Sequence, residues 1–412
     1  MEVYWIWLSE LEGLPPKGKL RVIAAFGTPE AAFRASKEEI FSRKGLTGDD
    51  CDALLNRDLT NAQKILESCW ERNISVLTMQ DCRYPELLRN ISDPPLVLYY
   101  VGSLPDFDRE LTIAVVGQRK ASGSGLLAAR RLGYELSLAG TIVVSGCAEG
   151  IDAAAMEGAL QGGSPVVGVL GGGVDVVYPR KNRRLFESVR DYGCLISEYP
   201  PGTPPIGWHF PIRNRIISGL SRGVVVAEAP RKSGSLITAE HAVEQGRDVF
   251  AMPGTAGLNS CAGSNDLLRQ GASIAETGND VLMGYAYLFE GHVHMLEAEE
   301  ASGYEQIFLE LPDNGNEKIA ASIVETPQLS DKKDVDKAEK QPYIDVHKAA
   351  AGLPPEDAAV LCLLEDGPLQ TDQIIRSCGM TASRVLGILT MLEIRGLIRA
   401  LPGGSYSLRE NL

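Results

Sequence analysis

Four short apolar runs between residues 111 and 228 each end in a polar turn that contains glycine. The runs are Leu111–Val116, Thr141–Val144, Pro165–Leu170 and Gly223–Glu228. Runs this short, rich in Val and Ile and bounded by glycine, are typical of buried parallel strands. Helix-length segments separate them, so the chain repeats a strand, a turn and a helix. This pattern predicts a doubly wound α/β domain.

The turns that follow these four runs should lie close together in space. In a parallel sheet the strands all end at one edge, and ligands of doubly wound sheets bind beyond these carboxyl ends. The turns in question start at Gly117, Ser145, Gly171 and Ser233. We therefore expect a ligand site along this edge of a Rossmann-like sheet.

Other patterns flank this central part. Residues 1–80 show helical periodicity through Glu71 and predict a small all-α domain. Between residues 84 and 102 a proline turn precedes an apolar run, which indicates a strand entering the central domain at 84–285. The stretch 297–350 is acidic and lacks periodicity, so we expect a flexible linker there.

Periodic patterns return in residues 355–412. Apolar spacing predicts helices over 356–364, 370–377 and 381–395, and the tail alternates around Gly403-Gly404 as a two-stranded hairpin would. Three helices and a hairpin are typical of a winged-helix domain. Because the third helix offers few basic residues, the pattern leaves open whether this domain contacts duplex DNA or another protein.

Composition excludes several classes of protein. With 412 residues, 44% of them hydrophobic, the chain can form two or three domains with sizeable cores. No apolar run approaches the roughly 20 residues of a membrane span. The N-terminus carries acidic residues where a signal peptide needs basic ones, so we expect a cytosolic protein that does not enter membranes. The eight cysteines form no CxxC pair, which argues against a zinc site and against a disulfide framework.

Acidic residues are unevenly distributed along the chain. The formal net charge of −14 argues at first against a nucleic-acid partner. Residues 290–348 hold 14 acidic residues against 6 basic ones, whereas residues 112–280 hold 15 against 16. The central domain is therefore close to neutral, and its local surface decides whether it attracts phosphate.

The turns at the predicted edge carry glycines, hydroxyl groups and cations. The turn at Gly117 follows a strand, opens a helix and carries Arg119 and Lys120, which suits a phosphate at a helix N-terminus. The spacing of a GxGxxG dinucleotide fingerprint and the GK[ST] of a nucleoside-triphosphate loop are both missing. For this turn alone, a tight strand-to-helix connection with solvated bases is the plainer alternative. Several cations along one edge favour a polyanion over a single small phosphate.

Two further turns, 178–182 and 210–215, are expected at the same edge. Fourteen residues in all these turns are predicted to bind the phosphates of such a ligand. They are Gly117, Arg119, Lys120, Ser145, Gly146, Arg180, Lys181, Arg213, Asn214, Arg215, Lys232, Ser233, Gly234 and Ser235. Because the same turns offer few aromatic side chains, we expect phosphate contacts to dominate over base stacking.

A series of motifs runs through this region in a fixed order. It comprises Asp93-Pro-Pro95, Gly117-Gln-Arg119, Gly150-Ile-Asp152, Gly171-Gly-Gly-Val-Asp175, Phe210-Pro-Ile-Arg-Asn-Arg215, Ser233-Gly-Ser235 and Met252-Pro-Gly254. In this order the motifs resemble those of the DNA-processing protein A (DprA/Smf) family. The resemblance covers about 84–285. It extends to the flanks, because family members often carry a helical N-terminal domain, of the sterile-alpha-motif or helix-hairpin-helix kind, and a C-terminal winged-helix domain.

This resemblance implies a homodimeric protein that binds single-stranded DNA through its core, is not an enzyme and needs no cofactor or metal. Such a protein protects incoming DNA and loads RecA recombinase onto it during natural transformation. By motif, Arg119 matches a DNA-contacting arginine of the family, and Arg180 or Lys181 falls where a second DNA-contacting base occurs.

Three positions depart from the family's pattern. Gln118 replaces a small hydroxyl residue, Glu149 stands where an arginine is common, and Met156 stands where a histidine is common. Glu149 matters most, because an acidic side chain in a phosphate groove lowers affinity unless it points away.

An enzyme is the competing hypothesis. Ser233-Gly-Ser235 followed by Glu240 is similar to the phosphate loop and the acid of nucleotide-phosphate N-glycosidases, in which a glutamate assists ribosyl cleavage. Glu240 would then act as the acid, while Arg119 and Arg213 would hold the phosphate. The alternative for Glu240 is an acidic residue near a helix N-terminus, where the helix dipole favours it.

Overall fold

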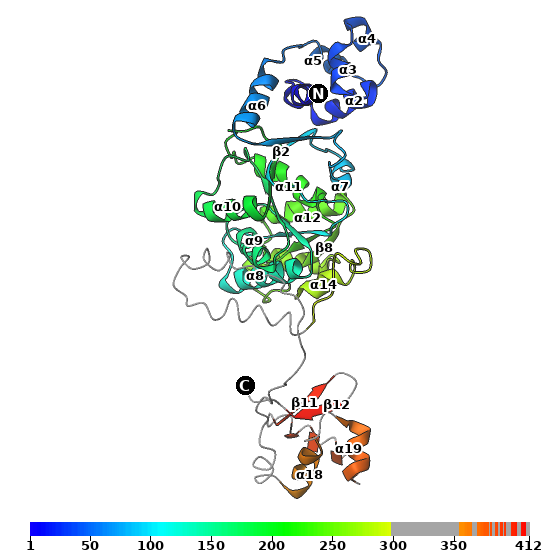
Figure 1. Ribbon diagram of the computed structural model, residues 1–412, viewed down its shortest axis with the longest axis vertical. Coiled ribbons are helices and arrows are strands. Elements are labelled where there is room, and N and C mark those ends of the chain that lie inside the picture. The colour runs from blue at the N-terminus through cyan, green and yellow to red at the C-terminus, as the bar shows by residue number, and fades with distance from the viewer. Residues whose placement is uncertain are drawn as a thin grey trace, which may run out of the picture. The chain divides into compact units, whose positions relative to one another are not determined.

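The computed structural model describes residues 1–297 and, with gaps, residues 354–408 (Figure 1). The described residues belong to two compact units, the first within residues 1–324 and the second within residues 325–412. Apart from Glu297, the linker predicted at 297–350 lies outside the described residues.

A mixed nine-stranded sheet forms the centre of the first unit, in the order β1-β2-β6-β5-β4-β3-β7-β8-β9. Its strands are β1 (Ser75–Thr78), β2 (Val97–Gly102), β3 (Thr112–Val116), β4 (Ile142–Ser145), β5 (Val166–Leu170), β6 (Gly193–Ser197), β7 (Gly223–Val226), β8 (Asp248–Ala251) and β9 (Ser273–Ile274). Strands β3 to β9 pair in parallel, while β1 and β2 extend the sheet in antiparallel fashion. The four strands predicted from the apolar runs are confirmed as β3, β4, β5 and β7.

Both faces of this sheet are covered, which is why the strands β3 to β7 are buried along their whole length. Along β3, Ile113 and Val115 belong to one buried cluster, whereas Ala114 and Val116 belong to another. Helices α8 (Gly123–Leu138), α9 (Ile151–Gly162) and α10 (Arg183–Tyr192) contribute to the first cluster, and α11 (His209–Gly219) and α12 (Gly234–Glu244) to the second. The two sets of helices flank the sheet in Figure 1.

The strand order reverses beside β3. From β3 the chain proceeds through β4, β5 and β6 to one side, and it then returns to place β7, β8 and β9 on the other side. The carboxyl ends of β3 and β7 therefore flank a topological switch point, where doubly wound folds bind their ligands. The turns after β3, β4, β5 and β7 all follow carboxyl ends of parallel strands, as predicted.

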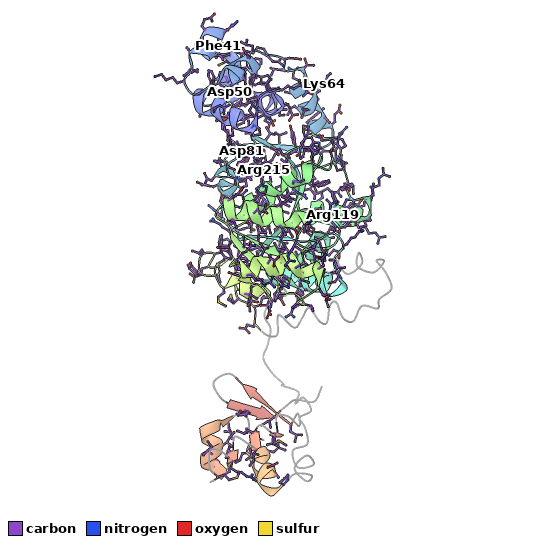
Figure 2. The ribbon with its side chains drawn as sticks, turned by 180° about the vertical axis from the view of Figure 1, so that it is seen from behind. Phe41, Asp50, Lys64, Asp81, Arg119 and Arg215 are labelled. Carbon is purple, nitrogen blue, oxygen red and sulfur yellow. The ribbon has the colours of Figure 1, made fainter. Side chains whose placement is uncertain are left out.

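Six short helices precede the sheet: α1 (Glu2–Glu10), α2 (Pro16–Phe26), α3 (Pro29–Arg34), α4 (Lys37–Ser42), α5 (Gly48–Ala53) and α6 (Thr60–Glu71). Capping boxes begin two of them, with Ser36 and Glu39 at α4 and Thr47 and Asp50 at α5. Figure 2 shows Asp50 among these helices, where its buried carboxylate accepts hydrogen bonds from Arg21 at 2.7 and 2.8 Å. The helices predicted through Glu71 are therefore present.

Two predicted boundaries differ from the structure. Residues 75–78 are not part of an all-α region, because they pair with β2 as the edge strand β1. At the other end, packing continues past residue 285, since Phe289, Val293 and Leu296 are buried in the same core cluster as the sheet. The Asn279 side chain also bonds both the backbone nitrogen and the backbone oxygen of Leu296 at 2.9 Å.

The second unit contains the helices and the hairpin predicted for it. It comprises α18 (Pro355–Leu363), β10 (Leu369–Gln370), α19 (Thr371–Cys378), β11 (Ile398–Leu401) and β12 (Ser405–Leu408). Within the predicted third helix, the described residues 384–385, 388–389 and 391–392 are helical. The three strands form one sheet in the order β10-β12-β11, and Val360, Ile374 and Leu389 are among the residues that form the core.

No helix among the described residues of either unit is long and apolar enough to cross a membrane.

Candidate nucleic-acid interface

A cavity of about 480 Å³ opens at the switch point between β3 and β7. The turn after β3, the turn after β4, the segment before α11 and the N-terminus of α12 form its walls. A recess of about 170 Å³ shares Arg119, Ala148, Tyr178 and Phe210 with this cavity and also borders Glu149. We call the cavity and the recess together the groove.

Arg119 stands at the mouth of the groove with an exposed side chain. Close backbone packing fixes its turn: a Cβ atom on Gly117 would lie 2.6 Å from the side chain of Ile151. Gly150 has a φ of +81°, and a Cβ atom there would lie 2.5 Å from the carbonyl oxygen of Arg119. These contacts bring the turns after β3 and β4 together and present the Arg119 guanidinium to the groove.

Two aromatic rings line the groove beside this guanidinium. The guanidinium carbon of Arg119 lies 5.0 Å from the ring centroid of Phe210, and the Tyr178 and Phe210 centroids are 5.6 Å apart. The groove therefore contains two aromatic side chains, and the prediction that phosphate contacts dominate over stacking stays a prediction. Both rings belong to turns predicted at this edge, where each precedes a proline, so a signal for them was present in the sequence.

The N-terminus of α12 forms the opposite wall of the cavity. Ser233, Gly234 and Ser235 all line it, as predicted. The two serine hydroxyl groups lie 2.7 Å apart, and the space where Gly234 would carry a Cβ atom is open. Asn214 of α11 lines the cavity and donates a hydrogen bond to the Gly234 carbonyl at 3.1 Å, so this predicted phosphate ligand also positions the α12 turn.

Arg213 forms part of the wall but is buried. Its guanidinium donates hydrogen bonds to the carbonyl oxygens of Gly146, at 3.0 Å, and of Val169. The Asp152 carboxylate accepts the Gly146 backbone N–H at 3.1 Å. Burial raises the pKa of Asp152, against the opposing effects of Arg213 and of neighbouring backbone N–H groups. Arg213 therefore fastens the turn after β4, whereas we had predicted it to bind phosphate.

Arg215 does not border the groove. Figure 2 shows it apart from Arg119 and nearer to the N-terminal helices. Its buried guanidinium bonds both carboxylate oxygens of Glu198, at 2.7 and 2.9 Å, and the Asp93 carboxylate at 3.2 Å. Burial opposes its charge, but these carboxylates raise the pKa of Arg215 overall. The prediction of Arg215 as a phosphate ligand is withdrawn on this geometry.

The remaining predicted residues fall into four groups. The side chains of Lys120, Arg180 and Lys232 are exposed near the same edge without lining the groove. Gly146 borders the recess. Ser145 is buried, with its hydroxyl donating to the Val115 carbonyl at 2.7 Å. The last, Lys181, forms an ion pair of 2.8 Å with Glu149.

The three departures from the family pattern have separate structural roles. Gln118 donates its side-chain amide to the buried carboxylate of Glu228. Met156 is buried, and the Cys147 thiol lies 3.6 Å from its sulfur. Glu149 borders the recess, and its carboxylate forms the ion pair with Lys181.

The structure gives little support to the enzyme alternative. Glu240, its proposed acid, is exposed on α12 and does not line the groove. Asp152, the carboxylate that does line the main cavity, is engaged by backbone N–H groups. Among the residues that the structure describes, no group of three or more His, Cys, Asp or Glu side chains could hold a metal ion.

Comparison with known proteins agrees with this architecture. Residues 75–286 match the family described as DNA recombination-mediator protein A, and residues 347–404 match the DprA winged helix domain. Protein Smf of Synechocystis sp. is 33% identical over 418 residues, which span 99% of each chain. DNA processing protein DprA of Streptococcus pneumoniae is 44% identical over 211 residues, 51% of this chain and 73% of that protein.

A solved structure supports the same assignment. The X-ray structure of DNA processing protein A from Streptococcus pneumoniae aligns with a TM-score of 0.60 at 35% identity, covering 69% of this chain and 98% of the other. Family matches in both units and a relative that spans the whole chain leave one conclusion. The chain belongs to the DNA processing protein A (DprA/Smf) family and combines a Rossmann-like core with a C-terminal winged-helix domain.

Proposed function

We propose that this protein binds single-stranded DNA in the groove and acts as a mediator of recombination. The observation that carries the proposal is the exposed guanidinium of Arg119 over the ring of Phe210, with Tyr178 beside it. Cations that follow the backbone, combined with aromatic rings on which bases stack, are the usual means of binding a single strand without sequence preference. The DNA-recombination description of the matched family supports the same class of ligand.

The groove favours an unpaired strand over a duplex. Its main cavity of about 480 Å³ has the size of a small-ligand pocket. A base can reach Phe210 and Tyr178 only when it is not stacked and paired inside a double helix. The exposed cations near the same edge, Lys120, Arg180 and Lys232, would then contact phosphates on either side of the bound nucleotide.

Fluorescence anisotropy with a labelled oligo-dT and a duplex of equal length tests this proposal across a salt series. We expect the single strand to bind more tightly and Arg119→Ala to lower affinity. The slope of log K against log salt should lose about 0.7, the value of one single-strand phosphate contact. Arg109→Ala is the matched control, because Arg109 is exposed on the loop before β3, at the opposite edge of the sheet. Equal binding by Arg119→Ala and the parent protein would refute the proposal.

The mediator role has a second part, the loading of RecA recombinase onto bound DNA in natural transformation. The family description as a recombination mediator supports it. The test is RecA assembly on a single strand covered with single-strand-binding protein, with and without this protein. We expect the parent protein to shorten the lag before RecA assembles. The Arg119→Ala variant should shorten this lag less than the parent protein does.

We also propose a homodimer through the core. Val243, Leu258 and Ile274 are 68%, 53% and 58% exposed, and Val243 and Ile274 come from elements that pack against β8 near the end of the sheet. Exposed apolar side chains in one region favour a protein contact. Light scattering should give a dimer for the parent protein and a monomer for the double variant Val243→Glu/Ile274→Glu. A monomeric parent protein at micromolar concentration would contradict this proposal.

Catalysis is not part of the proposal, and neither a cofactor nor a metal is required. Incubation with nucleoside monophosphates should release no free base. Release that disappears in Glu240→Gln would restore the N-glycosidase alternative.

A further inference from the structure

An acidic and a basic side chain meet at the recess of the groove. The Oε2 atom of Glu149 lies 2.8 Å from the Nζ atom of Lys181, and the two side chains are 37% and 62% exposed. Glu149 also lines the recess, together with Arg119, Tyr178 and Phe210. Glu149, paired with Lys181, therefore borders the space through which a strand bound to Arg119 would pass.

Neighbouring hydrogen bonds hold the two partners together. Glu149 belongs to the turn after β4, and Lys181 belongs to the short 3-10 helix Arg180–Asn182. The side-chain amide of Asn182 bonds the carbonyl oxygens of Cys147 and Ala148, both at 3.1 Å. The residue next to Lys181 is thus tied to the residues next to Glu149, so the ion pair follows from the way the two loops are fastened.

The position of Glu149 has an electrostatic consequence for any bound polyanion. A Lys181 ammonium that faces Glu149 cannot neutralise a phosphate until it leaves that carboxylate. An exposed ion pair of this kind is weak in water, so a phosphate can displace the carboxylate. The exchange replaces one ion pair with another, and it leaves Glu149 beside a negatively charged strand.

We propose that Glu149 competes with DNA phosphates for Lys181 and thereby sets the affinity of the groove for single strands. Strand binding exchanges the Glu149–Lys181 pair for a phosphate–Lys181 pair. This inference rests on the proposed single-strand binding. It adds that the Glu149 carboxylate lowers the affinity for single strands because it holds the Lys181 ammonium.

A double-mutant cycle in the full-length protein tests the exchange, with oligo-dT binding measured across a salt series. We expect Glu149→Gln to raise affinity at low salt by about three- to tenfold and to steepen the salt slope by up to about 0.7, as one gained phosphate contact requires. Lys181→Met alone should change affinity by less than this gain. In the Glu149→Gln background, Lys181→Met should remove the gain.

Glu157→Gln is the matched control for loss of one negative charge. Glu157 pairs with Arg130 at 2.6 Å and is 38% exposed, close to the 37% of Glu149, but it does not line the groove. Thermal unfolding of each variant confirms that the fold is retained. A control that gains as much affinity as Glu149→Gln would overturn the proposal, because overall charge would then explain the effect.

Three further results would also overturn it. In the first, Glu149→Gln leaves the affinity unchanged. In the second, Glu149→Gln lowers the affinity because the carboxylate contacts the strand. In the third, Glu149→Gln raises the affinity by the same factor in the Lys181→Met background. If the parent protein and every variant fail to bind a single strand at any salt concentration, the proposed function itself fails, and this outcome is distinct from the other three.

Discussion

The mouth of the groove and the wall behind it both carry arginines, but the surroundings of these arginines differ. At the mouth, Arg119 is exposed and rests on an aromatic ring. Behind it, Arg213 in the wall and Arg215, which lies outside the groove, are only 4% and 7% exposed and bond to carbonyl and carboxylate oxygens. The difference teaches that an arginine near a binding edge is available to a ligand when its guanidinium is exposed and is not bonded to buried oxygens of the fold.

The wall explains why the mouth keeps its shape. Consecutive residues of α11 reach three different parts of the first unit. Arg213 holds the turn after β4 and Asn214 holds the N-terminus of α12, both at the groove, whereas Arg215 holds Glu198 and Asp93 outside it. Mutations in the wall should therefore act first on stability, and mutations at the mouth should act first on DNA binding.

The largest effect is expected for Arg215→Met, which leaves two half-buried carboxylates without their buried cation. Breaking a buried ion pair in this way should lower the free energy of unfolding by about 3–5 kcal/mol. Urea denaturation followed by circular dichroism measures the loss. Arg231→Met serves as control, because its ion pair with Asp266 is 67% exposed on the arginine side and should cost less than about 1 kcal/mol. An Arg215→Met protein that is as stable as the parent but no longer binds a single strand would show that Arg215 acts in DNA binding and not in stability.

The next largest effect should come from Phe210→Ala, which removes the ring under Arg119. Stacking on one aromatic side chain contributes about 1–3 kcal/mol to single-strand binding. We expect a matching loss in the binding free energy at fixed salt, with little change in the salt slope. Phe210→Tyr keeps a ring and should retain most of the affinity. Phe210→Ala binding as tightly as the parent would show that phosphate contacts alone hold the strand.

Arg119→Lys should have a smaller effect, since it keeps the charge but loses the planar group. The salt slope of oligo-dT binding should stay as in the parent, because the phosphate contact remains. Affinity should drop by about 0.5–1 kcal/mol, the value of an exposed cation–π contact. A flatter slope would mean that the lysine no longer reaches the phosphate.

The smallest effect is expected when the chain is truncated after residue 297. The groove and its wall both precede this point, so folding of the first unit and oligo-dT binding should persist. Truncation after residue 285 provides the contrast. It removes Phe289, Val293 and Leu296 from the core and should lower the melting temperature. A truncated protein that folds after residue 297 but has lost single-strand binding would assign that activity to the second unit.

Much of the fold was predictable because it depends on local patterns. Runs of Val and Ile followed by turns that contain glycine identified β3, β4, β5 and β7 and their common edge. Strands β6 and β8 were missed because each holds a single Val or Ile residue, Ile196 and Val249, whereas each of the four predicted runs holds three. The sequence also contained no local sign that residues 75–78 pair with a strand about twenty residues further along.

The assignment of the cations depends on distant contacts and could not be predicted. In Phe210-Pro-Ile-Arg-Asn-Arg215 the two arginines look like surface residues. They are buried because their partners arrive from elsewhere in the chain: Gly146 for Arg213, and Asp93 and Glu198 for Arg215. The position of Arg119 depends only on its neighbours in the sequence, a strand followed by a glycine turn. The prediction therefore placed it correctly at the carboxyl edge of the sheet.

The buried carboxylate of Glu228 restricts how the loop after β3 can evolve. It accepts hydrogen bonds from the Gln118 amide and, at 2.6 Å, from the Ser122 hydroxyl. A Cβ atom on Gly125 would lie 1.7 Å from one of its oxygens, so a larger residue there would displace the carboxylate. We therefore expect positions 118, 122, 125 and 228 to vary together among homologues. Homologues that carry a shorter side chain at position 118 should also differ at position 228, and grafting one position without the others should give a poorly folded loop.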